Sequence, residues 1–166
     1  MLDRHIHPRL KPLLHRCVSI IDKPAITPDG LTLVGFAIGV LALPFLALGW
    51  YLAALAVIVL NRLFDGLDGA LARRRGLTDA GGFLDISLDF LFYALVPFGF
   101  MLADPAANSL AGGWLLFAFM GTGSSFLAFA ALAAKHQIDN PGYAHKSFYY
   151  LGGLTEGTET ILLFVL

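Results

Sequence analysis

The stretch LTLVGFAIGVLALPFLALGWYLAALAVIVL, Leu31 to Leu60, is an uninterrupted apolar run. A helix that crosses a bilayer needs about 20 apolar residues, so this run is too long for one span. Gly49 and Trp50 mark the expected turn between two spans. The run does not alternate apolar and polar residues, as a membrane β-strand would. The sequence therefore predicts two membrane helices here.

Composition extends this prediction to the whole chain. Of 166 residues, 57% are hydrophobic and 14% charged, and the mean hydropathy is +0.73. A soluble domain is about 45–50% apolar and about a quarter charged. The lone cysteine, Cys17, excludes an internal disulfide. We predict an all-α, polytopic membrane bundle with spans at Leu31–Trp50, Tyr51–Ala72, Phe83–Ala103, Trp114–Ala134 and Phe148–Leu166.

Basic residues predict the orientation of these spans. Arginines and lysines precede the first span, and Arg73, Arg74 and Arg75 follow the second. The loops at the other end of the spans contain no lysine or arginine. Since cytoplasmic loops carry an excess of both, we expect a cytoplasmic N-terminus in a bacterial-type inner membrane. The net charge of −1 averages an uneven distribution, and we expect membrane lipids rather than nucleic acid as partners.

The N-terminal segment, residues 1–27, is predicted to form an element separate from the membrane unit, residues 28–166. Its apolar residues fall near helical spacing with basic residues between them. This pattern favours an amphipathic helix on the inner membrane surface. A basic arm that serves only to set the topology is the alternative.

Four aspartates interrupt the apolar pattern. Asp65 and Asp68 share one helix face in the second span, and Asp85 and Asp89 share one in the third. The short loop between these spans makes them antiparallel neighbours, so both pairs can face one cavity near the cytoplasmic surface. Four carboxylates cannot all stay ionised in a poorly hydrated site without cations. A site that offers only oxygen ligands suits Mg²⁺ or Mn²⁺, and we expect two such ions to bind here. An Asp–Arg pair that only stabilises the bundle is the alternative.

The aspartates belong to a longer pattern, D-x2-D-G-x2-A-R-x7-G-x3-D-x3-D, which begins at Asp65 and ends at Asp89. It resembles the signature of the CDP-alcohol phosphatidyltransferases, from which it departs by having seven rather than eight residues before the second glycine. We expect this departure to give a tighter loop and not a lost site. The stretch TPDGLTL, residues 27–33, is similar to the family's P-N-x-x-T entry to the first span, with Asp29 in place of asparagine. The resemblance implies six spans, hence a sixth helix missing after Leu166, and a homodimer.

The resemblance also implies roles for individual residues. Asp65, Asp68, Asp85 and Asp89 would bind the metals, and Asp89 would also be the catalytic base that deprotonates the acceptor. Residues implied in binding the CDP and diphosphate of the donor are Gly69, Ala72, Arg73 and Gly81, with Thr32 and Asp29 as weaker candidates. The implied reaction transfers a phosphatidyl group from CDP-diacylglycerol to a small alcohol and releases CMP.

The alcohol is left open by the sequence. Lys135 and Lys146 suit an acceptor that carries a phosphate, such as glycerol phosphate or inositol phosphate. Glu156 and Glu159 suit an ammonium group, as in serine, ethanolamine or choline, or else they pair with Arg62 or Lys146. Because the two pairs indicate opposite acceptors, both classes stay open.

Two rival functions use the same carboxylates. Asn61-x3-Asp65 with Asp85-x3-Asp89 is similar to the paired motifs of UbiA-type prenyltransferases, which also bind a Mg²⁺-diphosphate. Those proteins are longer and separate their motifs by many spans. A divalent-cation transporter is the non-enzymatic alternative, but only Asp104 supplies an acidic residue at the opposite surface.

Overall fold

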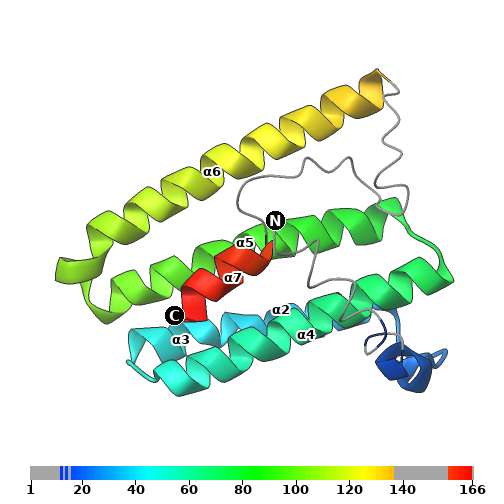
Figure 1. Ribbon diagram of the computed structural model, residues 1–166, viewed down its shortest axis with the longest axis horizontal. Coiled ribbons are helices and arrows are strands. Elements are labelled where there is room, and N and C mark those ends of the chain that lie inside the picture. Colours follow the sequence, from blue (N-terminus) through cyan, green and yellow to red (C-terminus); the bar gives the residue numbers. More distant parts are fainter. Residues whose placement is uncertain (1–11, 13, 15, 137–156, 166) are drawn as a thin grey trace.

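The fold is known from a computed structural model, which describes residues 12, 14, 16–136 and 157–165. Within these residues it contains helices and no strands, so the predicted all-α fold is confirmed (Figure 1). The principal helices are α2 (Pro28–Val40), α3 (Ala42–Ala47), α4 (Tyr51–Arg75), α5 (Asp79–Ala103), α6 (Pro105–Lys135) and α7 (Gly157–Val165). The predicted fifth span is described only over α7, and Lys146 and Glu156 lie outside the described residues.

The first predicted span is two helices rather than one. The break falls at Leu41, between α2 and α3. Pro44 has no backbone N–H, and its ring would clash with the carbonyl of Val40, four residues earlier, so a continuous helix is disfavoured. The chain then turns at Gly49, whose φ of 74° is readily adopted by glycine. The predicted turn at Gly49–Trp50 is thus confirmed, and the break at Leu41 is a correction.

The two helices that carry the aspartates form an antiparallel hairpin. Only residues 76–78 separate α4 from α5, and Gly76 has a φ of 111°. Thr78 caps α5, because its hydroxyl accepts a hydrogen bond from the backbone N–H of Gly81 at 3.0 Å. The tight connection expected from the shortened spacing is present.

Close packing of α2 on α4 fixes the register of the hairpin relative to the first span. A Cβ on Gly35 would lie 2.6 Å from the Cβ of Phe64, and one on Gly39 would lie 2.8 Å from Asn61 Nδ2. Small residues spaced four apart let membrane helices approach in this way. Further along the bundle, α3, α4 and α5 share a buried core of Ala42, Leu46, Ala54, Val57, Ile58, Phe92 and Val96.

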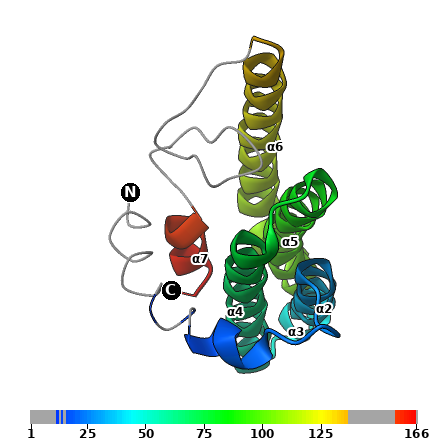
Figure 2. The ribbon, with the colours of Figure 1, turned by 90° about the vertical axis from the view of Figure 1, so that its right-hand side faces the viewer.

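Within the part of the chain that the structure describes, three helical segments are long and apolar enough to cross a membrane: Pro28–Ala47, Asp79–Ala103 and Pro105–Lys135. Helix α4 is as long as α5, at 25 residues each, but α4 also carries three arginines in its last turn. Helix α6 packs chiefly on α5 and stands at the edge of the bundle (Figures 1 and 2). It exposes Leu110, Trp114, Phe117 and Met120, as expected of a surface that faces lipid.

The second half of the N-terminal segment is attached to the bundle. Residues 16–21 are helical, and Val18 is buried against Ala70 and Leu71 of α4. Asp22 pairs with Arg74 at 3.1 Å and with Arg75 at 2.6 Å. Arg75 also donates to the backbone carbonyls of Lys23 and Ile26. This segment therefore lies against the end of α4 (Figure 2); whether it also lies on a membrane surface stays a prediction.

Candidate active site

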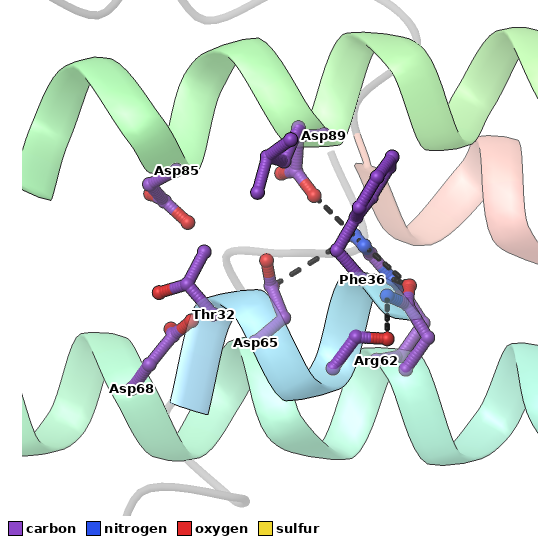
Figure 3. Close-up of a pocket in the computed structure, with 10 residues that line it drawn as sticks. Thr32, Phe36, Arg62, Asp65, Asp68, Asp85 and Asp89 are labelled. Carbon is purple, nitrogen blue, oxygen red and sulfur yellow. Dashed lines mark hydrogen bonds and ion pairs between the residues drawn. The ribbon is translucent and has the colours of Figure 1, made fainter. Parts of the chain in front are cut away.

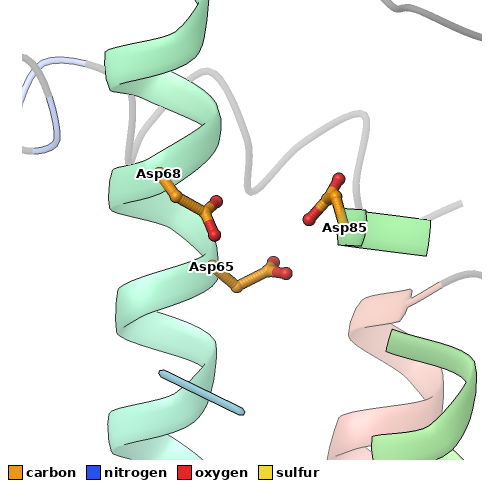
Figure 4. A group of neighbouring side chains, drawn as sticks. All are labelled: Asp65, Asp68 and Asp85. Atoms are coloured by element: carbon orange, nitrogen blue, oxygen red, sulfur yellow. The ribbon is translucent and has the colours of Figure 1, made fainter. Parts of the chain in front are cut away.

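Three of the four aspartates converge between α4 and α5. Asp65, Asp68 and Asp85 each offer a carboxylate oxygen, and the three oxygens lie within 4.8 Å of one another (Figure 4). Asp65 and Asp68 come from one face of α4, and Asp85 comes from the facing side of α5. The structure thus brings the two acidic stripes into contact, although Asp89 is not part of this group.

Asp68 shows that the cluster is suited to a cation. It is only 3% exposed, and its Oδ2 atom is buried without a hydrogen-bond partner among the described residues. A buried carboxylate oxygen without a partner is costly, and a bound cation satisfies it. The donor set consists of oxygens only, which Mg²⁺ and Mn²⁺ favour. The residues present therefore fit a divalent ion.

The three aspartates of the cluster also line a small pocket (Figure 3). Its free volume is about 10 Å³, enough for one water-sized sphere. Thr32 lies beside Asp68, and its hydroxyl donates to the carbonyl of Pro28 at 3.1 Å. The lining residues are Thr32, Gly35, Phe36, Asn61, Arg62, Asp65, Asp68, Asp85, Leu88 and Asp89.

Asp89 lines the same pocket but is engaged differently. Its Oδ1 atom lies 2.8 Å from Nη2 of Arg62 in a hydrogen-bonded ion pair (Figure 3). Arg62 Nη1 also lies 3.8 Å from Asp65 Oδ2. Arg62 therefore places a cation between the carboxylate cluster and the remaining aspartate.

The sequence that carries these carboxylates is similar to known proteins. A sequence model of the CDP-alcohol phosphatidyltransferases matches residues 25–164, which include every residue of the pocket. The chain belongs to the CDP-alcohol phosphatidyltransferase family. It is accordingly a membrane-embedded transferase of phospholipid biosynthesis. The match does not support the prenyltransferase hypothesis or the transporter hypothesis.

Relatives of this phosphatidyltransferase include proteins from bacteria and archaea. The inner membrane protein YnjF of Escherichia coli K12 is 90% identical over 166 residues, all of this chain and 81% of that protein. The archaetidylinositol phosphate synthase of Pyrococcus horikoshii is 38% identical over 98 residues, which are 58% of this chain and 52% of that protein. An uncharacterized protein of Aquifex aeolicus is 33% identical over 96% of the chain and 76% of that protein. No solved structure matches the chain.

The other signature residues of the phosphatidyltransferase lie toward the connection between α4 and α5. The Arg73 guanidinium folds back over Gly69, since a Cβ there would lie 3.2 Å from Nη1. Gly81 faces Asp29 of α2. Ala72, half-buried on α4, lies beside Arg73 in the chain and does not line the pocket. Gly69, Arg73, Gly81 and Asp29 are also outside the pocket lining.

The predicted acceptor residues are only partly described. Lys135 is exposed at the last position of α6. Glu159 lies half-buried in α7, where it has an interaction partner. Neither lines the pocket, so the described residues do not decide between the two acceptor classes.

Asn61 and Arg62 line the pocket but were not predicted from the sequence as residues of the candidate site. Asn61 is only 4% exposed, and its Nδ2 donates to the carbonyl of Gly35 at 2.9 Å. Arg62 was considered as a partner of the fifth-span glutamates, whereas the structure pairs it with Asp89. The available signal was its position three residues before Asp65, which places both on one helix face.

Proposed function

We propose that this enzyme transfers a phosphatidyl group from CDP-diacylglycerol to a small alcohol and releases CMP, with two Mg²⁺ or Mn²⁺ ions as cofactors. The observation that carries this proposal is the convergence of Asp65, Asp68 and Asp85, with oxygens within 4.8 Å of one another. The buried Oδ2 of Asp68, which has no hydrogen-bond partner among the described residues, supports a cation there rather than a structural ion pair.

The donor is proposed to bind across the cytoplasmic end of α4 and α5. Asp65, Asp68 and Asp85, with Asp89 in addition, would hold the divalent ions. When bound, these ions would neutralise the diphosphate and stabilise CMP as the leaving group. The donor-binding residues are proposed to be Thr32, Asp29, Gly69, Ala72, Arg73 and Gly81.

Arg73 is suited to a diphosphate because its guanidinium is planar and always charged. It lies at the exposed end of α4 with its head over Gly69. The missing side chain of Gly69 leaves room for this approach.

Asp89 is proposed to act as the general base. Its carboxylate would take the proton from the acceptor hydroxyl, and the resulting oxygen would attack the phosphorus that carries the lipid. The bond from this phosphorus to the bridging oxygen of the diphosphate would break, and CMP would leave with the electron pair. Asp89 suits this role because it lines the pocket and its side chain is 31% exposed, so an acceptor can reach it. Arg62 provides an opposite charge beside it.

The position of the site suits a lipid donor. Asp65 lies ten residues before Arg75, or about 15 Å along the helix. The basic end of α4 is predicted to be cytoplasmic, so the nucleotide and acceptor would arrive from that side while the acyl chains stay in the bilayer.

The acceptor class is proposed from the relatives. Two of them are archaetidylinositol phosphate synthases, one from Pyrococcus horikoshii and one from Methanothermobacter thermautotrophicus. Their names favour a phosphorylated acceptor, which Lys135 and Lys146 would bind, over an amine bound by Glu156 and Glu159. We also propose a homodimer. Gly121 and Ser124 on the exposed face of α6 would permit close packing of a second copy.

CMP release tests the reaction directly. The purified full-length protein is given CDP-diacylglycerol and a panel of phosphorylated and amino alcohols, with Mg²⁺, Mn²⁺ or EDTA. We expect CMP release only with a divalent ion, and its loss in Asp85→Asn and Asp89→Asn whatever the acceptor. If Lys146→Ala raises the KM of the acceptor, the acceptor carries a phosphate. If Glu156→Gln raises it instead, the acceptor carries an amine. CMP release unaffected by EDTA would contradict the metal requirement.

A further inference from the structure

Arg62 is held by more partners than an ion pair with Asp89 requires. Its Nε and Nη2 both donate to Asn61 Oδ1, at 2.8 and 2.6 Å. Its Nη1 donates to the hydroxyl of Tyr93 at 3.2 Å. Asn61 is itself fixed by its bond to the carbonyl of Gly35. Apart from its ion pair with Asp89, the guanidinium is therefore bonded to Asn61 of α4 and to Tyr93 of α5. Asn61 links it in turn to α2.

Aromatic rings complete this anchorage. The guanidinium carbon lies 4.6 Å from the ring centroid of Phe92 and 5.3 Å from that of Tyr93. Phe92 is fully buried in the core. Cation–π contacts of this kind strengthen when they are shielded from water, and the Arg62 side chain is only 17% exposed. The position of the guanidinium is thus determined by neighbours other than the carboxylates.

Asp89, by contrast, depends on Arg62 for its position. Among the described residues, Arg62 is its only hydrogen-bond donor. Asp89 lies one helical turn from Asp85 on the same face of α5, so a rotamer change would move it toward the other carboxylates. Arg62 is also the only basic residue among the described residues that line the pocket.

We propose that Arg62 is a positioning residue for Asp89. It fixes this carboxylate on its own side of the pocket, where Asp89 can add to the ion-binding group of Asp65, Asp68 and Asp85 and still face the acceptor hydroxyl. This role rests on the proposed function. A lysine at this position would supply the charge but not the planar fork that joins Asn61, Tyr93 and Asp89.

The test compares Arg62→Met and Arg62→Lys in the full-length protein, with Arg74→Met as the matched control. Methionine is a long side chain without the charge or the hydrogen-bond donors of arginine. Arg74 is an arginine of the same helix that pairs with Asp22 outside the pocket. The measurements are kcat and donor KM for CMP release, and the Kd of Mn²⁺ in the absence of substrates.

We expect Arg62→Met to lower kcat by about 10-fold to 100-fold while donor KM changes by less than about twofold. Mn²⁺ binding should be unchanged or tighter, because a cation beside the carboxylates has been removed. Arg62→Lys should recover part of kcat, and Arg74→Met should match the wild type.

Three results would overturn this role. Unchanged kcat in Arg62→Met shows that Asp89 needs no support from Arg62. Weaker Mn²⁺ binding or a donor KM that rises as kcat falls shows that Arg62 maintains the whole pocket. A wild-type protein that releases no CMP from any acceptor overturns the proposed function itself, and this result is distinct from the first two.

Discussion

Gly81 of α5 lies directly against Asp29 of α2. A Cβ at Gly81 would come within 2.9 Å of Asp29 Oδ1 and equally close to the hydroxyl of Thr78, which caps α5. Two segments of the family pattern, the entry to the first span and the second glycine, are therefore in contact near the connection between α4 and α5. A side chain larger than hydrogen at position 81 would therefore compete with Asp29 for space.

The first prediction uses this contact. Gly81→Ala should destabilise the protein by less than about 1 kcal/mol, because the added methyl group meets only the ends of the Asp29 and Thr78 side chains, which can move aside. Asp29→Ala made in the same chain should recover part of the loss, since it removes one of the two clashing groups. Thermal unfolding of the single and double variants in detergent measures the coupling. Strictly additive changes in Tm would mean that Asp29 does not oppose the new side chain.

The second prediction concerns the buried Asp68. Asp68→Asn removes the charge but keeps the shape, so Mn²⁺ should no longer raise the Tm, whereas it should raise that of the wild type. CMP release should fall by at least about 100-fold, because the cations that neutralise the diphosphate would be lost. The control is Asp104→Asn, the same substitution at the cap of α6, where asparagine caps as well as aspartate. Retained Mn²⁺ stabilisation in Asp68→Asn would remove this residue from the metal site.

The third prediction tests the close packing of α2 on α4. Gly39→Ala should lower stability by about 1–3 kcal/mol, because its Cβ would lie 2.8 Å from Asn61 Nδ2 and 2.9 Å from Phe92. Gly113→Ala, in α6, has nothing within 4 Å of the new Cβ and should be neutral or slightly stabilising. The two Tm values are compared in the same detergent. Equal values would show that the α2–α4 contact tolerates a methyl group.

The fourth prediction concerns the attachment of the N-terminal segment. Asp22→Asn should raise amide hydrogen exchange in residues 16–26, because Asp22 holds both Arg74 and Arg75. Global stability should change by less than about 1 kcal/mol, as is usual for ion pairs near the surface. Asp79→Asn, an exposed acid at the start of α5, is the control. Unchanged exchange in residues 16–26 would mean that the packing of Val18 suffices to hold the segment.

Sequence reasoning was most successful where one helix decides the outcome. The helical period places Asp65 with Asp68, and Asp85 with Asp89, without knowledge of the neighbouring helices. The turn at Gly49 and the short connection after Arg75 follow from glycine and from spacing. The membrane bundle itself follows from the apolar runs, which are independent of tertiary contacts.

Where two helices must be rotated relative to one another, the sequence was insufficient. The period alone does not tell that Asp85 faces Asp68 while Asp89 faces Arg62, because this depends on the angle at which α5 packs on α4. The break at Leu41 was also missed, although Pro44 signals it. The acceptor residues depend on the segment around Lys146 and Glu156, which the structure does not describe.

The uneven composition of α4 has a consequence for biogenesis. Residues 51–60 are apolar, but Arg62, Asp65 and Asp68 follow near the middle of the helix. Helix α4 is not among the described segments that are apolar enough to span a bilayer. Charged residues at the centre of a helix oppose its exit from the translocon into lipid. We therefore expect α4 to enter the membrane only as a pair with α5, so that the aspartate cluster assembles in the same step as membrane insertion.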